Sequence, residues 1–386
     1  MSTNPLARYA AMLKNLQRRQ HLRALADNRG ADFSSNDYLG LAASPSIRNA
    51  LIAELENGLT TGSGGSRLLR GNHPEHELLE AEAASCFRAP SMLYFNNGYT
   101  ANLAVLSTLP LRGDLIVYDE LIHASAREGM RAGKAETVSI PHNNTDAFDR
   151  AICTWRKKGG RGTPWIVVES LYSMDGDIAP LSDLIEIADH YDAFLFIDEA
   201  HATGVHGPDG RGFATGLGNR QNIITLHTCG KAMASSGGLL GGDPVLRDFL
   251  VNRARPFIYS TAPSPLQVSA TRLALKTMIA EQHRRPELHR LIAFANAQFA
   301  NAQFADRLGK AGSGTQILPL VIGDADRTLR IAHRMQTDGF DIRAIRPPTV
   351  PAGTARLRIT ITLNVDEPTI TRMFEHLATI MAEEMI

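Results

Sequence analysis

Cysteine is scarce in this chain, and its few cysteines form no pattern typical of a disulfide framework or a zinc site. The three cysteines, Cys86, Cys153 and Cys229, lie far apart, and no Cys-x-x-Cys pair occurs. Cysteine zinc sites need closely spaced thiols, and disulfide frameworks are typical of short secreted chains. The sequence therefore predicts a cytoplasmic protein in a reducing compartment, without a metal centre.

An excess of charge of one sign is also lacking, and so are long hydrophobic runs. Lys plus Arg equals Asp plus Glu, 40 against 40, so the formal net charge is zero. A broadly basic surface for nucleic acid is therefore not expected. No apolar run approaches the roughly 20 residues that a membrane-spanning helix needs. We expect neither nucleic acid nor a membrane as a partner.

The length of the chain predicts more than one domain. A chain of 386 residues is too long for a single hydrophobic core, so two domains are the natural expectation. An amphipathic helix is expected at 6–26, because apolar residues recur there at helical spacing. The expected parts are an N-terminal helix and arm (1–45), a large domain (46–280) and a small α+β C-terminal domain (281–386).

Short apolar segments alternate with helical segments through the large domain. Because these segments are uniformly apolar, the sheet should be buried on both faces and largely parallel, which predicts an α/β fold. Ligands of such sheets bind beyond the carboxyl ends of the strands. The expected strands are 92–95, 115–118, 165–170, 193–197, 222–227 and 238–242.

Chemically versatile residues gather at or just past the ends of these predicted strands. Lys231 has only small or apolar neighbours in its loop, and desolvation would make its amine easier to deprotonate and more nucleophilic. Taken alone, Lys231 is better explained as an ordinary loop lysine that reaches solvent. The joint position of seven residues predicts one binding site: Gly98, His123, Ser173, Asp198, His201, Thr228 and Lys231.

An anion site is predicted where a strand, a glycine turn and a helix follow one another around Gly98 and Tyr99. The N–H groups of a helix N-terminus and the helix dipole favour negative charge at one point. A second glycine cluster, GSGGSR at 62–67, lacks the Gly-Lys-Ser/Thr of a nucleotide-binding loop. Its glycines favour close backbone approach to a ligand or to another subunit.

An acid, histidines and a desolvated lysine together suit an aldehyde cofactor such as pyridoxal phosphate. This cofactor needs a lysine for a Schiff base, a carboxylate that faces the pyridine nitrogen, and donors for its phosphate. Alternative interpretations exist for single residues: Asp198 could cap a helix, and His201 could be a structural loop histidine. The predicted contacts are Lys231 at the aldehyde, Asp198 at the ring nitrogen, His123 on the ring face, Ser173 and His201 at the ring hydroxyl, and Thr228, Gly98 and Tyr99 at the phosphate.

Several strings of residues resemble those of a known family. The chain from about Phe33 to the C-terminus is similar to the α-oxoamine synthases, which are fold-type I enzymes that use pyridoxal phosphate and resemble class II aminotransferases. Each string alone is weak, but the joint match is specific. The strings are FSSNDYLGL (33–41), GSGGSR (62–67), LIHAS (121–125), SMDGD (173–177), DEAHATG (198–204), TCGK (228–231) and PFIYST (256–261).

The resemblance implies roles for individual residues. Lys231 matches the Schiff-base lysine, His123 the ring-stacking residue and Asp198 the partner of the ring nitrogen. Ser173, His201 and Thr228 match contacts to the cofactor, and Gly98 and Tyr99 match contacts to its phosphate. The remaining implied sites are Arg23 and Thr349 for the acyl substrate, Asn36 and Arg358 for the amino-acid carboxylate, and Ser260 and Thr261 for a phosphate across a dimer interface.

One branch of this family fits best. The string AIRPPTVPAGTARLR at 344–358 resembles the branch that condenses L-alanine with a pimeloyl thioester in biotin biosynthesis. The acyl donor could be pimeloyl-CoA or a pimeloyl carrier protein, and a homodimer with shared active sites is implied. Alternatives are sister enzymes that condense glycine with an acetyl or succinyl thioester, or serine with a long acyl chain. A non-catalytic binding protein of the same fold is a more distant alternative.

Overall fold

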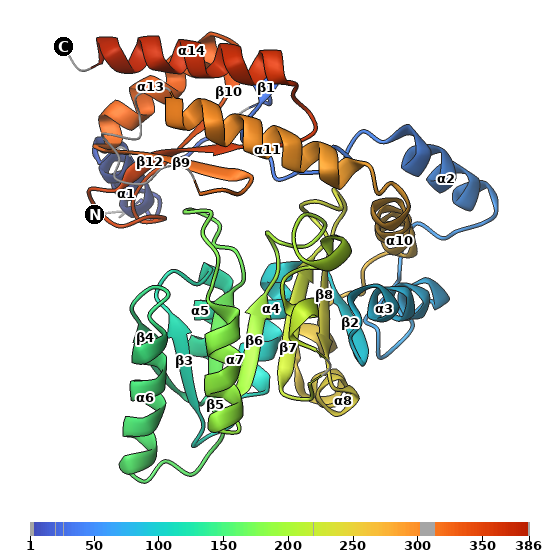
Figure 1. Ribbon diagram of the computed structural model, residues 1–386. Helices are drawn as coiled ribbons and strands as arrows, with labels where there is room; N and C mark the ends of the chain where they lie inside the picture. The colour runs from blue at the N-terminus through green and yellow to red at the C-terminus, as the bar shows by residue number, and fades with distance from the viewer. Residues whose placement is uncertain (1–3, 20, 26, 219, 302–312, 385–386) are drawn as a thin grey trace. The chain divides into compact units, whose positions relative to one another are not determined.

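The computed structural model describes residues 4–19, 21–25, 27–218, 220–301 and 313–384 (Figure 1). The described chain divides into two compact units. The large unit contains Asn36–Ser173 and Asp177–His289. The small unit contains the N-terminal segment to Ser35, the short segment Met174–Gly176, and the C-terminal segment from Arg290 onward.

The large unit is built on a seven-stranded sheet in the part of the chain that the structure describes, with the strand order β2-β8-β7-β6-β5-β3-β4. All neighbouring strands are parallel except β8, which runs antiparallel to both β2 and β7. The prediction of a largely parallel sheet is therefore confirmed. The strands are β2 (Ser91–Phe95), β3 (Leu115–Asp119), β4 (Glu136–Ile140), β5 (Pro164–Glu169), β6 (Phe194–Asp198), β7 (Ile223–Thr228) and β8 (Gly238–Gly242).

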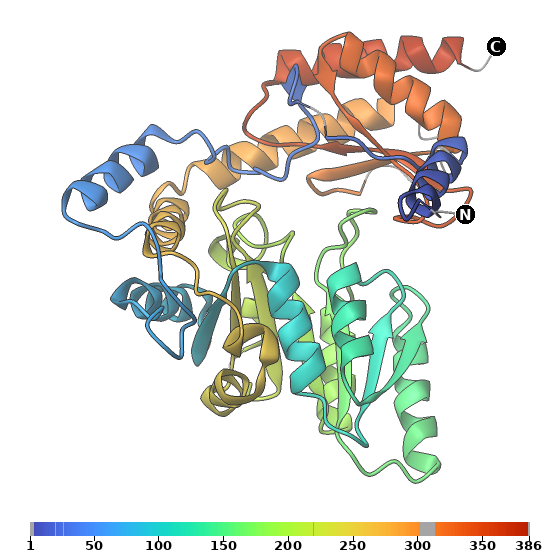
Figure 2. The same cartoon turned by 180° about the vertical axis from the view of Figure 1, so that it is seen from behind.

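Helices cover both faces of this sheet, as the two opposite views show (Figures 1 and 2). Helices α4 (Gly98–Thr108) and α5 (Ala124–Ala132) pack on one face, and α6 (Thr145–Lys157) and α7 (Leu181–His190) pack on the other. Successive side chains of β6 point to opposite faces of the sheet. Phe196 packs in the core beneath α4 and α5, and Leu195 and Ile197 pack in the core beneath α6 and α7. The other helical segments of the large unit are α2 (Pro45–Glu56), α3 (Pro74–Phe87), η1 (Pro208–Gly210), η2 (Ala214–Leu217), α8 (Pro244–Arg253), α9 (Arg255–Ile258) and α10 (Pro265–Ala280).

Strand β4 was not expected from the sequence. Its residues Glu136, Thr137 and Ser139 are exposed, and Val138 is only half-buried. The strand lies at the edge of the sheet and pairs only with β3, so it is not sandwiched between two helical layers. An edge strand of this kind lacks the uniform apolar pattern on which the prediction of the other strands rested.

The small unit is α+β, as expected. Its main sheet is antiparallel with the order β11-β12-β9, and a short parallel pair joins β1 to β10. The strands are β1 (Ala31–Asp32), β9 (Ile317–Gly323), β10 (Phe340–Asp341), β11 (Arg343–Ile345) and β12 (Ala355–Thr360). The helices are α1 (Ala7–Arg18), α13 (Ala325–Thr337) and α14 (Glu367–Glu383), and the boundary between the units falls within α11 (Arg284–Asn301).

The N-terminal segment differs from the expected helix over 6–26, of which positions 20 and 26 lie outside the described residues. Helix α1 ends at Arg18, where the N–H of His21 bonds the carbonyl of Leu16 at 2.8 Å and closes the last turn. Because β1 pairs with β10, the arm to Ser35 belongs to the small unit. The chain thus passes between the units at 35/36, 173/174, 176/177 and 289/290, whereas the expected domain boundaries were 45/46 and 280/281.

Within the described ranges, no helix has both the length and the apolar character needed to cross a bilayer. Helix α1 also buries none of its residues in this chain. The side chains of Leu6, Tyr9 and Leu13 are 68%, 65% and 54% exposed. The predicted apolar stripe of α1 therefore faces solvent in the single chain.

The core of the large unit generates a stability prediction. Leu195 is fully buried between the central strands and α7, so we expect Leu195→Ala to lower the free energy of unfolding by about 2–5 kcal/mol. The matched control is Val245→Ala, because Val245 is 74% exposed and its replacement should change stability by less than about 0.5 kcal/mol. Chemical denaturation measures both, and equal effects would contradict the described packing.

Candidate functional site

Lys231 lies in the loop between β7 and β8, at the carboxyl end of β7. The carbonyl of Lys231 accepts a hydrogen bond from the N–H of Ala234 at 2.7 Å, and the backbone of Cys229 bonds Gly237 and Ser235 across the same loop. The half-buried side chain of Lys231 places Nζ 2.7 Å from Nε2 of His201. The lysine and one predicted histidine thus meet at the end of the parallel strands.

A chain of hydrogen bonds continues from this lysine into the large unit. His201 Nδ1 lies 2.6 Å from the hydroxyl of Tyr38, and that hydroxyl donates to Oδ1 of Asn36 at 3.1 Å. A charged lysine can only donate, so Nε2 of His201 would accept and Nδ1–H would donate to Tyr38. Tyr38 and His201 are buried, so this polar chain is shielded from water. Sequence reasoning missed Tyr38, although it belongs to the string FSSNDYLGL.

Asp198 is the last residue of β6 and is 5% exposed. Its Oδ1 accepts from the N–H of Ala200 at 3.0 Å, and its Oδ2 accepts from Nδ2 of Asn102 at 2.9 Å. A buried carboxylate stays ionised only when donors compensate for lost water. Two donors hold Asp198 in a fixed orientation at the sheet edge.

Asn102 extends this network from α4 to the predicted stacking residue. Its Nδ2 also donates to Oγ of Ser125 at 3.0 Å, and Ser125 Oγ lies 2.7 Å from Nδ1 of His123. Asn102 is 2% exposed, and its Oδ1 is buried without a hydrogen-bond partner among the described residues. The path Asp198–Asn102–Ser125–His123 therefore joins two predicted site residues through two that the sequence did not reveal.

The pKa of His123 depends on the charges of Asp198 and Lys231. Partial burial lowers the pKa of His123 below the ordinary 6.5, the negative charge of Asp198 opposes this shift, and the positive charge of Lys231 adds to it. Measured over the whole residue, His123 is exposed. His123 is consequently neutral at neutral pH, and both Lys231 and Asp198 are close enough to influence it.

Glu169 is a buried acid of the site that sequence reasoning missed. It ends β5 and pairs in register with Asp198 on β6. Complete burial, together with the negative charge of Asp198, raises the pKa of Glu169 above its usual range, although Lys231 opposes this shift. The sequence does carry a signal for Glu169, because it is the only charged residue of the otherwise apolar strand β5.

Thr228 and Gly98 lie against each other at the predicted anion site. A Cβ on Gly98 would stand 2.5 Å from the Thr228 hydroxyl oxygen, so only glycine permits this approach. Gly98 is the first residue of α4, and Asn97 caps the helix by accepting from the N–H of Thr100 at 2.8 Å. A hydroxyl donor is thereby held at a helix N-terminus, which suits a phosphate.

Four further predicted residues belong to the large unit: Tyr99 lies in the first turn of α4, and Ser173, Ser260 and Thr261 lie on loops. Tyr99 is 47% exposed, and Ser173 is half-buried in the loop after β5. The carbonyl of Thr261 accepts from Nδ2 of Asn96 at 3.3 Å, next to the capping residue of α4. Ser260 donates its hydroxyl to the carbonyl of Pro256 at 2.7 Å. The contacts predicted for Thr261 and Ser260 across a dimer interface remain predictions.

The predicted substrate residues divide between the units. Asn36 belongs to the large unit, whereas Arg23, Thr349 and Arg358 belong to the small unit. Within the small unit, Arg23 Nη2 donates to the hydroxyl of Thr349 at 3.2 Å, which brings the two predicted acyl contacts together. Arg358 is 6% exposed and donates to the hydroxyl of Thr360 at 2.9 Å.

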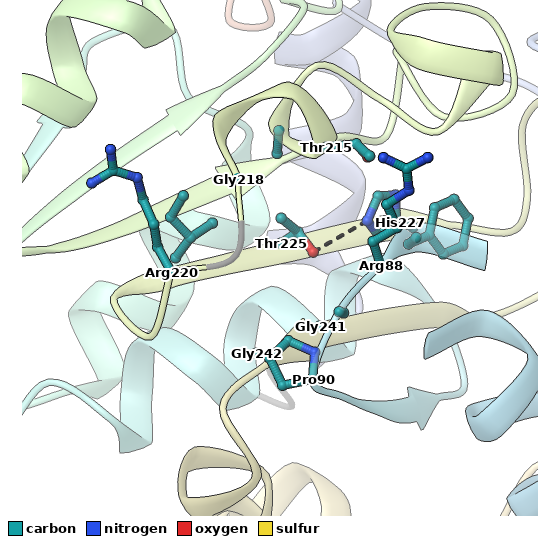
Figure 3. Close-up of a pocket in the computed structure, with 13 residues that line it drawn as sticks. Arg88, Pro90, Thr215, Gly218, Arg220, Thr225, His227, Gly241 and Gly242 are labelled. Carbon is teal, nitrogen blue, oxygen red and sulfur yellow. Dashed lines mark hydrogen bonds between the residues drawn. The ribbon is translucent and has the colours of Figure 1, made fainter. Parts of the chain in front are cut away.

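A separate cavity of about 180 Å³ lies at the other end of the strands, near the start of β7 and the end of β8 (Figure 3). His227 is one of the residues that line this cavity. The hydroxyl of Thr203 donates to the carbonyl of Glu199, so the Thr203 oxygen accepts from the Nδ1–H of His227 at 2.9 Å. Burial lowers the pKa of His227 to about 3, so its ring is neutral. The geometry is that of a structural histidine, stacked on Phe87 at 3.8 Å between ring centroids.

The donor set fits pyridoxal phosphate better than a metal. Among the described residues, no group of three His, Cys, Asp or Glu side chains could hold a metal ion. The site instead offers an amine at Lys231, an oriented carboxylate at Asp198, and a hydroxyl at the N-terminus of α4. The glycine at position 98, whose Cβ would collide with Thr228, leaves this cradle open to the phosphate.

The fold and this site agree with the comparison to known families. The aminotransferase class I and II family matches residues 29–377, so the chain belongs to that family. The serine palmitoyltransferase of S. paucimobilis with a bound PLP–myriocin aldimine shares the fold with a TM-score of 0.88, at 24% identity over 98% of both chains. An 8-amino-7-oxononanoate synthase structure from Francisella tularensis gives a TM-score of 0.76, at 24% identity over 93% of this chain and 100% of the other.

Curated relatives define the group more narrowly. The 8-amino-7-oxononanoate synthase of Citrifermentans bemidjiense is 40% identical over 85% of this chain and 82% of its own length. That of Geobacter sulfurreducens is 37% identical over 90% and 88%, and 8-amino-7-oxononanoate synthase 2 of Bacillus subtilis is 39% identical over 86% and 82%. Within the aminotransferase family, the chain therefore belongs with the 8-amino-7-oxononanoate synthases, as the resemblance of its strings had implied.

The close approach of Gly98 to Thr228 generates a binding prediction. Gly98→Ala should weaken binding of pyridoxal phosphate by about tenfold or more, because the new methyl group displaces the Thr228 hydroxyl. A fluorescence titration of the apoprotein measures this dissociation constant. The control is Gly216→Ala, since Gly216 has open space around it and its backbone is not in the left-handed region. Unchanged affinity in Gly98→Ala would contradict the proposed phosphate cradle.

Proposed function

We propose that this protein catalyses the 8-amino-7-oxononanoate synthase reaction with pyridoxal phosphate as its cofactor. L-alanine loses its carboxylate as carbon dioxide, its α-carbon takes the pimeloyl group from a thioester, and the free thiol leaves. The observation that supports this most is the meeting of Lys231, Asp198 and His123 at one edge of the sheet, where the first two both shift the pKa of the third. The similarity to synthases of biotin biosynthesis adds the substrate class.

Residues of the large unit would hold the cofactor. When bound, pyridoxal phosphate supplies an aldehyde for an amine and a ring that accepts electrons from the substrate. Thr228 and the backbone at Gly98 and Tyr99 would bind the phosphate, and His123 would pack on the ring face. Ser173 and His201 would reach the ring hydroxyl, and Lys231 would anchor the aldehyde carbon.

Lys231 would also move the proton. With L-alanine bound, the neutral amine of Lys231 would accept the α-proton of the amino acid at Nζ. His201, 2.7 Å away, orients that amine, and Tyr38 orients His201 in turn. A base within hydrogen-bond reach of the proton that it removes contributes about 10²–10⁴ in rate.

Asp198 would keep a proton on the ring nitrogen. A buried carboxylate favours the protonated form of a facing base, because the opposite charges attract strongly in a low dielectric. The bonds from Asn102 and Ala200 prevent Asp198 from turning away. Asn102 is thus a positioning residue for the acid on which electron withdrawal by the ring depends.

Four residues are proposed to bind the substrates. Asn36 and Arg358 would bind the carboxylate of L-alanine, because an amide and a guanidinium donate to carboxylate oxygens. Arg23 and Thr349, which are hydrogen-bonded to each other, would contact the pimeloyl chain. The acyl group could arrive as pimeloyl-CoA or on a carrier protein.

We also propose a homodimer in the reducing cytoplasm. Helices α1 and α2 bury none of their residues in the single chain, and Ile52 and Leu55 of α2 are 48% and 37% exposed. Unburied apolar helix faces favour association with another chain. All three cysteines are free thiols, which suits a reducing compartment.

The lysine assignment yields a spectroscopic prediction. Purified wild-type protein should be yellow and should lose its visible absorbance when borohydride is added. Lys231→Ala should lack the absorbance of the lysine-bound cofactor and lose turnover by about 10³-fold or more, because anchor and base are both removed. Lys276→Ala is the control, since Lys276 pairs with Glu82 at 3.0 Å and is half exposed. A Lys231→Ala protein that keeps colour and turnover would exclude this role.

The choice of amino acid is tested by exchange of the α-proton in deuterated water. We expect the holoenzyme to exchange L-alanine faster than glycine or L-serine, as followed by NMR. Exchange confined to glycine would replace the proposal with a glycine-using sister enzyme, and exchange confined to serine with a serine-using one. A colourless protein that exchanges none of the three would support a non-catalytic binding protein.

A further inference from the structure

A histidine outside the predicted site lies between two carboxylates of the large unit. His142 Nδ1 is 2.9 Å from Oδ1 of Asp119, and its Nε2 is 2.5 Å from Oδ2 of Asp177. Asp119 is fully buried, whereas the side chains of His142 and Asp177 are 22% and 30% exposed. A ring that bonds carboxylates through both nitrogens must carry a proton on each, so His142 is an imidazolium.

The surrounding charges favour this protonated form. Burial lowers the pKa of His142, but hydrogen bonds and attraction from Asp119 and Asp177 outweigh it and raise the pKa to about 10. Burial likewise raises the pKa of Asp119, but bonds from His142 and the backbone N–H groups of Asn143 and Leu121 bring it below the ordinary value. The other groups that face the ring segment are Tyr172, edge-on at 4.6 Å, and Glu120, which accepts from the N–H of His142 at 3.1 Å.

Each of these two aspartates lies in a loop that carries a predicted cofactor contact. Asp119 ends β3 and begins the turn to His123, where it accepts from the N–H of Leu121 at 2.8 Å. Asp177 closes the loop that begins at Ser173, and its carbonyl accepts from the N–H of Tyr172 at 2.9 Å.

Asn143 links the same two loops beside the histidine. Its N–H donates to Asp119 Oδ2 at 2.8 Å, and its side-chain amide donates to Asp177 Oδ2 at 3.0 Å. His142 and Asn143 follow β4 directly, so the edge strand delivers both donors to this point. The two loops are therefore tied together by a charged ring and an amide.

We propose that His142 is a positioning residue whose imidazolium clamps the His123 loop to the Ser173 loop, so that both meet the cofactor ring in register. The inference rests on the proposed function, because it assumes that these loops receive pyridoxal phosphate. Removal of the imidazolium leaves the buried Asp119 carboxylate beside Asp177 without a cation between them. The loops then separate, and the cofactor binds more weakly and with a different ring orientation.

The test compares wild type, His142→Gln and Asp177→Asn, with His376→Gln as the matched control. His376 also pairs with an aspartate, Asp338 at 3.7 Å, but it belongs to the small unit. Each apoprotein is titrated with pyridoxal phosphate, and the visible circular dichroism of the bound cofactor reports ring orientation. We expect a dissociation constant about tenfold higher for His142→Gln and about threefold higher for Asp177→Asn, with altered dichroism in both. The control should match wild type.

The pH dependence of apoprotein unfolding gives a readout that needs no cofactor. The pKa of His142 is raised from 6.5 to about 10 in the folded chain, so the clamp stabilises fully below pH 6.5 and its contribution is lost as pH rises through 10. The difference in unfolding free energy between wild type and His142→Gln should therefore shrink from pH 6.5 to 10. A difference independent of pH would overturn the imidazolium clamp.

The binding outcomes separate this inference from the proposed function. Wild-type protein that fails to bind pyridoxal phosphate would overturn both. Wild-type binding with unchanged affinity and dichroism in His142→Gln would overturn the clamp alone. If His142→Gln does not fold, the test rests on Asp177→Asn. An Asp177→Asn protein whose affinity and dichroism equal those of wild type would overturn the clamp.

Discussion

The parallel pairing of β5, β6 and β7 is the constraint on which the rest of the site depends. Glu169 pairs with Asp198, and Asp198 pairs with Leu226, two residues before Thr228. Parallel strands end at one edge, so carboxylates and hydroxyls that are far apart in sequence come together there. Oriented donors offset part of the cost of burying this polar edge, as the N–H of Ala200 and the amide of Asn102 do for Asp198.

Those partners come from the helices behind the sheet. The side-chain amide of Asn102 on α4 donates to Asp198 and also to the hydroxyl oxygen of Ser125 on α5. That hydroxyl in turn lies within hydrogen-bond distance of His123. On the other side, Tyr38 and Asn36 continue the bonds from Lys231 and His201. The acid and the amine are thus each supported by a separate network, and both networks meet the same edge of the sheet.

Much of the fold and the primary site could be predicted because the signals are local. Uniformly apolar strands, and the residues just past their ends, can be recognised without knowing which distant segments they contact. Asp198 and Lys231 were predicted in this way. Asn102 could not be found, because an asparagine inside an apolar helix gains meaning only when α4 packs on β6. His142 was missed for a related reason, since the polar edge strand β4 that precedes it has no apolar pattern.

The central claim is that the amine of Lys231 holds the cofactor aldehyde beside the Asp198 carboxylate. Borohydride reduction of the holoenzyme, proteolysis and mass spectrometry of the peptides test this most directly. The account predicts one phosphopyridoxyl group per chain, on the peptide that contains Lys231. A label on any other lysine, or no label on a protein that binds pyridoxal phosphate, would contradict it.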